Sequence, residues 1–389
     1  MNEAKRLENV SEYYFSKKLE EVRALDAQGK NIINLGIGSP DLPPPAAAVM
    51  ALTKALLLPN AHQYQPYKGQ PQFREAIAAF YKEHYEVDLD HASEILPLMG
   101  SKEGILHISM AFLNEGDEVL IPNPGYPTYA AVTKLVGAKV RDYDLVESNH
   151  WLPDFDALSK TDLSNVKLMW VNYPHMPTGT KATKAVFEAL IDFGKKHDIL
   201  IVNDNPYSFI LNDKPLSILS IEGAMETALE LNSLSKTFNM SGWRVGMVSG
   251  SKANIQSILK MKSNMDSGMF LPLQVGAIAA MRNAKGFLED LNVQYAKRRE
   301  VAVALALALD CEPLDDVAGL FVWAKIRSGT ASEVLVDELL YKYGIFVTPG
   351  TIFGSNGEGY IRISLCASEE KLEAALNKIE KEKLIYTEL

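Results

Sequence analysis

Cysteine is the residue that this sequence most nearly lacks. The 389 residues include only Cys311 and Cys366, which excludes a disulfide framework and a multi-cysteine metal site. No uninterrupted apolar run approaches the length of a membrane span. We also expect no secretory signal, because the first ten residues carry charges and no apolar stretch follows them. These observations favour a cytoplasmic protein that contacts no membrane and holds no metal.

Positively charged residues are also fewer than negatively charged ones. The chain has 39 lysines and arginines against 49 aspartates and glutamates, a formal net charge of -10. This sign argues against a surface for nucleic acid or for an anionic membrane. The length allows one large hydrophobic core and a second, smaller one.

Internal repeats and low-complexity tracts are absent, and the middle of the chain alternates two patterns. Short β-rich apolar runs lie at 117–121, 138–143, 165–172 and 198–204, and helical patterns lie between them. This alternation is typical of βα units on a largely parallel sheet, an α/β fold. Near the end, GLFVWAKI, YGIFVTPG and EGYIRISL predict strands flanked by helices, which indicates a smaller α+β domain.

The predicted domain boundaries follow from breaks in the secondary-structure pattern. An amphipathic helix is expected at roughly 3–28, before the triple proline at 43–45. We predict a large domain at 46–286 and a small domain that both chain ends form, at 1–45 and 287–389.

The stretch SLSKTFNMSGWRVG places Lys236 in a loop between two apolar runs. Most lysines are solvated surface residues, but desolvation lowers the pKa of an amine and makes it a nucleophile for a carbonyl. Arg244, eight residues later, could clamp a phosphate in bidentate fashion, and Ser233 could donate to the same anion.

A second anion site is predicted where an apolar strand runs into Gly100, Ser101 and Lys102 and then directly into a helix. Backbone N–H groups at such a helix start attract anions. The stretch is not a Walker A loop, because the first glycine of that pattern is absent, and a plain strand–helix turn is the alternative interpretation.

Three further residues carry possible chemistry. Asp204 ends a buried strand, where parallel sheets bind ligands, although it could instead cap a helix. Tyr126, between prolines in NPGYPTY, could stack on a flat ring or simply occupy a turn. Arg362 is flanked by isoleucines, so its burial requires an anionic partner from the protein or from a ligand.

One ligand accounts for all of these groups. It has a carbonyl for Lys236, a phosphate for the serines and Arg244, a cationic ring nitrogen for Asp204 and a flat face for an aromatic ring. Its substrate brings a carboxylate for Arg362. Pyridoxal 5'-phosphate with an α-amino acid meets these requirements.

The same stretches resemble a known family. SLSKTFNMSGWRVG is similar to the cofactor-lysine signature of class I/II aminotransferases, which are fold-type-I pyridoxal-phosphate enzymes like aspartate aminotransferase. NLGIGSPDLPPP, YQPYKGQPQFREAIA and GYIRIS resemble further family segments, in the same order. The resemblance implies a homodimer with active sites at the subunit interface, which moves the amino group of an L-amino acid to a 2-oxo acid.

The resemblance also implies a role for each residue. Lys236 forms a Schiff base with the cofactor and shuttles a proton, Asp204 pairs with the ring nitrogen, and Tyr207 bonds the phenolic oxygen. Tyr126 stacks on the ring, and Arg362 takes the substrate carboxylate beside a backbone group of Gly38. The phosphate is held by Gly100, Ser101, Lys102, Ser233 and Arg244, with Tyr64 reaching it from the partner subunit.

One position departs from the family pattern. Asparagine usually precedes Pro-Thr-Gly and bonds the phenolic oxygen, but here NYPHMPTG places Met176 there. A thioether cannot donate a hydrogen bond. Either His175 or Asn172 compensates, or Tyr207 bonds the oxygen alone.

The sequence also bears on three other functions: a dehydrogenase, a transcription regulator and a lyase. A dinucleotide-binding dehydrogenase is disfavoured because GIGSPD lacks the third glycine and runs into prolines, and a transcription regulator would need an additional DNA-binding module. A lyase on the same scaffold, by carbon–sulfur β-elimination or cyclopropane-forming γ-elimination, stays open because it would share Lys236, Asp204 and Arg362. The substrate side chain is not readable, and no second arginine stands in an obvious position for a distal carboxylate.

Overall fold

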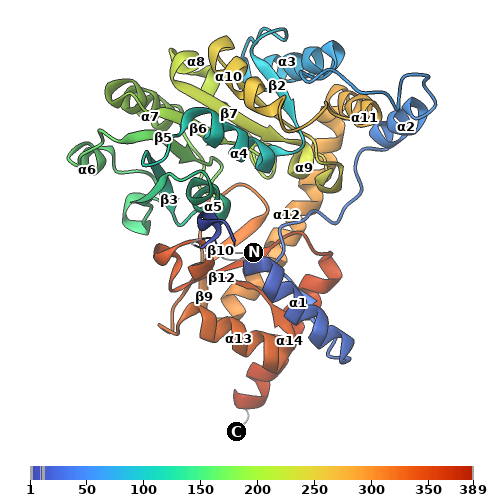
Figure 1. The fold of residues 1–389 in the computed structure, drawn as a ribbon. Helices are drawn as coiled ribbons and strands as arrows, with labels where there is room; N and C mark the ends of the chain where they lie inside the picture. The colour runs from blue at the N-terminus through green and yellow to red at the C-terminus, as the bar shows by residue number, and fades with distance from the viewer. Residues whose placement is uncertain (1–2, 9, 11–13, 388–389) are drawn as a thin grey trace.

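The computed structural model describes residues 3–8, 10 and 14–387, which form two lobes around separate sheets (Figure 1). The larger sheet has seven strands in the order β2-β8-β7-β6-β5-β3-β4. Its neighbours pair in parallel, except that β8 is antiparallel to both β2 and β7. The α/β fold with a mostly parallel sheet is therefore confirmed. The strands are β2 (Ile95–Leu98), β3 (Glu118–Asn123), β4 (Lys139–Asp144), β5 (Val166–Val171), β6 (Leu200–Asp204), β7 (Ala228–Ser233) and β8 (Gly246–Gly250).

Helices cover both faces of this sheet, since its strands are apolar on both sides. Leu168 and Trp170 pack into one core cluster, whereas Met169 and Val171 pack into the other, as the two-residue period of a strand requires. Gly104 lets α4 lie close to the sheet, because a Cβ there would be 2.6 Å from side-chain carbons of Leu98 and Leu231. One face carries α4 (Ser101–Phe112), α5 (Pro127–Leu135) and α10 (Lys252–Lys262); α3 (Pro71–Tyr85), α7 (Lys184–His197) and α11 (Leu271–Arg282) contribute to the other cluster.

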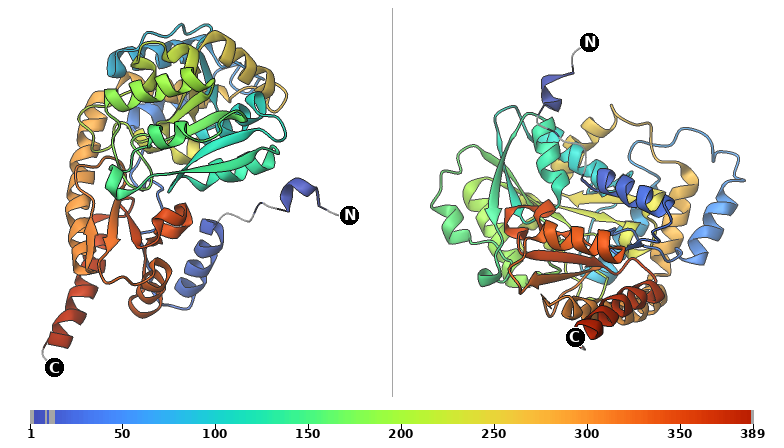
Figure 2. Two further views of the ribbon diagram at one scale, coloured as in Figure 1. Left: turned by 90° about the vertical axis from the view of Figure 1, so that its left-hand side faces the viewer. Right: turned by 90° about the horizontal axis from the view of Figure 1, so that it is seen from below.

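The second lobe joins both ends of the chain. Its four-stranded sheet has the order β12-β13-β10-β9, and β1 pairs in parallel with β11. Helix α12 (Ala284–Ala308) runs from the large lobe into this one (Figure 2), so the predicted boundary at residue 286 falls inside a helix; the domain limits stay a prediction. The strands are β1 (Ile33–Asn34), β9 (Cys311–Pro313), β10 (Phe321–Ile326), β11 (Ile345–Phe346), β12 (Thr348–Pro349) and β13 (Tyr360–Ser364). The helices are α1 (Tyr14–Ala27), α13 (Ser332–Tyr343) and α14 (Glu369–Thr387).

Three shorter helices and α2 (Ala46–Ala55) complete the connections: α6 (Phe155–Ser159), α8 (Ala224–Thr227) and α9 (Leu234–Thr237). Across the part of the chain that the structure describes, we find no helix whose length and apolar character would let it cross a bilayer.

Two local predictions were wrong. The single helix expected at 3–28 is a short 3-10 turn, Lys5–Leu7, followed by α1, with Val10 non-helical between them. Lys236 lies in the single helical turn α9 rather than in a loop, because the turn begins directly where β7 ends.

A buried carboxylate lies on β7, an inner strand of the large sheet. Glu230 on β7 is fully buried. Its Oε1 accepts from Ser217 Oγ at 2.9 Å, and its Oε2 accepts from the Ile218 amide at 3.0 Å and from Asn203 Nδ2 at 3.2 Å. Burial raises the pKa of Glu230 from 4.5 to about 7, and these hydrogen bonds oppose the rise.

This raised pKa predicts a pH-dependent stability. The folded protein binds the proton more tightly than the unfolded chain, so the stabilisation present below pH 4.5 is lost as pH rises through about 7. Glu230→Gln should remove that loss. The free energy of unfolding of the variant, minus that of the parent, should grow by roughly 3 kcal/mol over this window.

Urea unfolding of the cofactor-free protein between pH 5 and 8 measures this difference. Glu226→Gln, which changes an exposed carboxylate on α8, is the matched control and should follow the parent. Parallel pH profiles of Glu230→Gln and the parent would contradict the assignment.

Candidate active site

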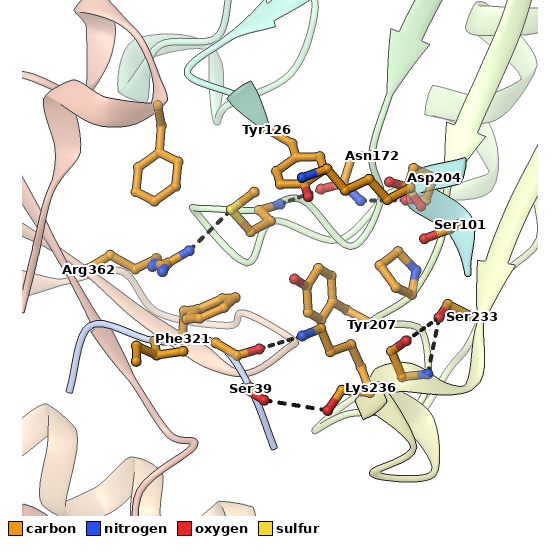
Figure 3. Close-up of a pocket in the computed structure, with 18 of the residues that line it drawn as sticks. Ser39, Ser101, Tyr126, Asn172, Asp204, Tyr207, Ser233, Lys236, Phe321 and Arg362 are labelled. Carbon is orange, nitrogen blue, oxygen red and sulfur yellow. Dashed lines mark hydrogen bonds between the residues drawn. The ribbon is translucent and has the colours of Figure 1, made fainter. Parts of the chain in front are cut away.

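A pocket of about 530 Å³ lies between the carboxyl ends of the large sheet and the second lobe (Figure 3). Two predicted site residues do not line the pocket. They are Gly100, which adjoins it, and Tyr64, which is 91% exposed. The pocket brings together the other predicted residues: Gly38, Ser101, Lys102, Tyr126, Asp204, Tyr207, Ser233, Lys236, Arg244 and Arg362.

Lys236 enters the pocket from the turn that follows β7. Ser233 caps this turn, since its Oγ accepts from the Ser235 amide at 3.1 Å. The Lys236 ammonium donates to the Gly38 carbonyl. Burial lowers the pKa of Lys236, and the positive charges of Arg362 and Arg244 lower it further. The protein therefore favours the neutral amine, which is the nucleophilic form.

Asp204 lies at the carboxyl end of β6 and is 5% exposed. Its Oδ2 accepts from the Tyr129 hydroxyl at 2.9 Å, whereas its Oδ1 is buried without a hydrogen-bond partner among the described residues. Burial raises the pKa of Asp204 to about 6, and the bond from Tyr129 opposes the rise. A buried carboxylate with an open acceptor fits a protonated ring nitrogen, because that group supplies both a donor and the missing positive charge.

The start of α4 forms a cradle for an anion. Gly100 has a φ of 89°, and a Cβ there would lie 2.3 Å from Nη2 of Arg244, so only glycine admits this approach. Ser101 begins the helix and faces the same cavity. Burial lowers the pKa of Lys102, as does the charge of Arg244 beside it. Converging cations at a helix N-terminus fit a phosphate. The pocket therefore fits pyridoxal phosphate at two groups, the phosphate at the start of α4 and the ring nitrogen at Asp204.

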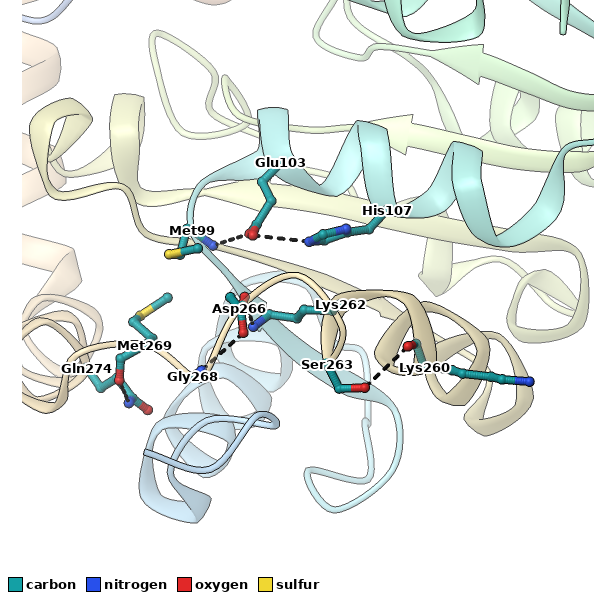
Figure 4. Close-up of polar contacts among 10 residues, drawn as sticks. All are labelled: Met99, Glu103, His107, Lys260, Lys262, Ser263, Asp266, Gly268, Met269 and Gln274. Carbon is teal, nitrogen blue, oxygen red and sulfur yellow. Dashed lines mark hydrogen bonds and ion pairs between the residues drawn. The ribbon is translucent and has the colours of Figure 1, made fainter. Parts of the chain in front are cut away.

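A buried ion cluster supports this cradle from behind (Figure 4). Glu103 Oε2 accepts from the Met99 amide at 2.6 Å, and Oε1 lies 3.1 Å from His107 Nε2. Lys262, only 1% exposed, pairs with Asp266 at 2.5 Å. The possible ligand atoms of Glu103, His107 and Asp266 lie within 4.8 Å of one another. The Lys262 ammonium supplies a positive charge beside Asp266, and Glu103 anchors the turn before α4 through the Met99 amide.

Arg362 is held on β13 between aromatic rings. Its guanidinium carbon lies 3.9 Å from the ring centre of Phe321 and 4.6 Å from that of Phe353. Nη2 donates to the Gly36 carbonyl at 2.8 Å, and Nη1 contacts the sulfur of Met176 at 3.3 Å. Such contacts fix the plane of the guanidinium and orient it for bidentate recognition of a carboxylate.

Met176 lies in the pocket at 5% exposure. His175 cannot replace the missing donor there, because one ring nitrogen bonds Thr178 Oγ1 at 2.8 Å and the other bonds the Pro124 carbonyl at 3.1 Å. Asn172 lines the pocket, but its amide nitrogen donates to the backbone carbonyl of Asp204. The bond to Asp204 uses one hydrogen of the Asn172 amide, so its second N–H and the Tyr207 hydroxyl are the candidate donors to the phenolic oxygen.

Some lining residues escaped the sequence reasoning. Tyr129 follows Tyr126 by three residues in α5, a spacing that places both on one helix face, and it stacks on Trp170 with ring centres 4.9 Å apart. Arg23, on α1, also lines the pocket. The sequence offered no second arginine in an obvious position for a distal carboxylate, and its pattern does not indicate that Arg23 lies in this lining.

The sequence also offers Tyr14, Phe15, Ile37, Met269 and Phe270 as apolar residues for a substrate pocket, with core packing as the alternative. Ile37 lines the cavity, but Met269 and Phe270 do not. The side chains of Tyr14 and Phe15 lie outside the described residues.

Comparison with known proteins agrees with this geometry. The family model of aminotransferase class I and II matches residues 30–379. An LL-diaminopimelate aminotransferase of Oleidesulfovibrio alaskensis is 41% identical over 380 residues, covering 97% of this chain and 98% of the relative. Among solved structures, apo-BacF from Bacillus subtilis superposes with a TM-score of 0.94 at 36% identity, covering 98% of each chain. An aminotransferase from Staphylococcus aureus gives 0.88 at 34% identity, covering 97% of this chain and 98% of that one.

The methionine in the pocket generates a spectroscopic prediction. A donor beside the phenolic oxygen of the cofactor favours its anion and lowers the pKa that the visible absorbance reports. Met176→Asn should therefore lower this pKa relative to the parent. Met176→Leu, which supplies no donor, is the matched control and should leave it within a few tenths of a unit. A pH titration of the visible band measures all three proteins, and an unchanged pKa in Met176→Asn would show that this position lacks contact with the phenolic oxygen.

Proposed function

The chain belongs to the class I and II aminotransferases, and on that premise we propose that LL-diaminopimelate is its amino donor and a 2-oxo acid its amino acceptor. Its reaction is the pyridoxal-phosphate-dependent transfer of an amino group. The matched relatives favour this reaction over the lyase reactions that the sequence left open. The substrate proposal rests on one observation, that relatives with this activity are about 40% identical over 97% of the chain.

We propose the following roles for the residues of the pocket. Pyridoxal phosphate, when bound, supplies a reactive carbonyl and an electron-withdrawing ring. The Lys236 amine holds the cofactor through that carbonyl and, once released, moves a proton at the substrate α-carbon. Asp204 keeps the ring nitrogen protonated through its open Oδ1. Tyr207 donates to the phenolic oxygen, and Tyr126 covers a face of the ring.

The remaining groups orient the two anions. Arg362 receives the α-carboxylate of the substrate beside Gly38, held in plane by its aromatic neighbours. The phosphate is bound by Gly100, Ser101, Lys102, Ser233 and Arg244. Because the lining encloses Lys236 and Asp204 away from water, their charges interact strongly with the bound ligand.

A homodimer is also part of the proposal. Large apolar side chains are exposed along α2, the segment after it and the turn before α11: Met50, Leu57, Tyr64, Met265 and Phe270, at 58%, 87%, 91%, 58% and 40% exposure. The segments adjoin, since the Gln70 amide donates to Gln274 at 2.7 Å and His62 contacts the Phe270 ring. An exposed apolar surface of this kind favours a protein partner. Tyr64 on this surface would then reach the phosphate of the partner subunit. A cytoplasmic location stays a prediction from the sequence.

A half-reaction tests the proposed activity. LL-diaminopimelate should bleach the visible band of the bound cofactor in a single turnover, and a 2-oxo acid should restore it. Lys236→Ala should lose this cycle, and borohydride reduction of the parent should label Lys236. Release of ammonia with a 2-oxo product, without restoration by an added 2-oxo acid, would indicate a lyase instead.

The dimer predicts a property of Tyr64. Sedimentation should give twice the chain mass, and Tyr64→Phe should weaken cofactor binding by roughly tenfold, since one hydrogen bond to a charged group is lost. Tyr67→Phe removes a hydroxyl from the same segment and serves as the control. A monomer that binds cofactor with full affinity at micromolar concentration would refute this arrangement.

A further inference from the structure

The lining of the pocket carries more positive charge than the bound cofactor and an α-carboxylate require. Among the described residues of the lining, Asp204 is the only carboxylate, against five basic side chains: Arg23, Lys102, Lys236, Arg244 and Arg362. Under the proposed function, on which this inference rests, Lys102 and Arg244 neutralise the phosphate, Lys236 binds as an amine, and Arg362 meets the α-carboxylate. Of the cations in the described part of the lining, Arg23 is the one to which these roles assign no anion.

The packing of α1 explains why Arg23 faces the cavity. Lys18 bonds Asp337 of α13 at 3.1 Å, and Glu21 accepts from the hydroxyl of Tyr341 on the same helix. These contacts fix the rotation of α1. Leu19 and Arg23, four residues apart, then share another helix face and both line the pocket.

The Arg23 guanidinium is available for a ligand. Its side chain is exposed, and within the described part of the chain it makes no hydrogen bond, ion pair or ring contact. Leu19 and Ile37 lie in the same lining. The cavity therefore offers an aliphatic surface together with a planar cation, in addition to the α-carboxylate site at Arg362.

We propose that Arg23 binds the distal carboxylate of the substrate, so that this enzyme selects amino acids and 2-oxo acids with a second carboxylate at the end of an aliphatic chain. A guanidinium recognises a carboxylate through two parallel hydrogen bonds, and an amide or an ammonium in place of that carboxylate offers no equivalent acceptor pair. Discrimination of this kind lies in the distal group alone and leaves the reacting carbon unaffected.

Matched substrate pairs isolate the distal carboxylate. L-lysine equals LL-diaminopimelate without one carboxylate, and glutamine is the neutral isostere of glutamate. In the holoenzyme, Arg23→Gln should lower kcat/KM roughly tenfold or more for LL-diaminopimelate and glutamate, because partial exposure keeps a charged hydrogen bond at the lower end of its range. Lysine and glutamine should be affected less than twofold. Arg23→Lys should recover part of the loss.

The control variant is Lys17→Gln, which removes one exposed cation from the same helix outside the pocket lining. It should leave both substrate pairs unchanged. Binding of glutarate to the holoenzyme, measured by calorimetry, should weaken in Arg23→Gln and stay unchanged in Lys17→Gln.

The outcomes separate this inference from the proposed function. Turnover of LL-diaminopimelate that Arg23→Gln leaves intact would overturn the role of Arg23 and keep the substrate. No turnover of LL-diaminopimelate, together with an Arg23-dependent preference for glutamate over glutamine, would overturn the substrate and support Arg23. Two further results would overturn the role of Arg23. One is an equal loss of kcat/KM in Arg23→Gln for both members of each substrate pair. The other is a parent enzyme that does not prefer the substrate with the distal carboxylate.

Discussion

The burial of opposite charges at the carboxyl end of one sheet is the constraint on which the rest of this site depends. Asp204 loses water and its pKa rises to about 6, while burial lowers the pKa of Lys236. Both shifts oppose the charged form that water would favour. The protein satisfies one oxygen of Asp204 through Tyr129 and leaves the other open. A ligand with a protonated ring nitrogen and a carbonyl would offer a hydrogen-bond donor to Asp204 and an electrophile to the Lys236 amine.

Rigid surroundings make this arrangement specific. Tyr129 is held by stacking on Trp170, and the turn before α4 is anchored by Glu103 within a buried ion cluster. Arg362 is clamped between two aromatic rings from the second lobe. The two lobes therefore contribute different parts of the pocket, because Asp204 and Lys236 lie at the carboxyl ends of strands of the large sheet and Arg362 lies on the small sheet. Preorganisation of this kind removes the cost of ordering the side chains during the reaction.

Met176 shows how one substitution changes the electronics of a conserved geometry without changing the fold. Its sulfur contacts Arg362 in the place where an amide would offer both a donor and an acceptor. His175 is occupied by Thr178 and Pro124, so the neighbour that could have compensated points elsewhere.

The sequence by itself determined the mostly parallel sheet with its alternating strands and helices, and it predicted site residues that the structure brings into one pocket. Residues at strand ends, such as Asp204, are readable because the carboxyl ends of parallel strands must meet along one edge. The helix expected at 3–28 is interrupted at Val10, an interruption that the helical periodicity of the segment does not record. Only the tertiary structure decided which side chains beyond these ends share the cavity. Arg23 faces it because α13 fixes the rotation of α1, and the ring of His175 is held by the distant Pro124 carbonyl as well as by the nearby Thr178 hydroxyl. Such contacts join segments far apart in the chain, and no local periodicity records them.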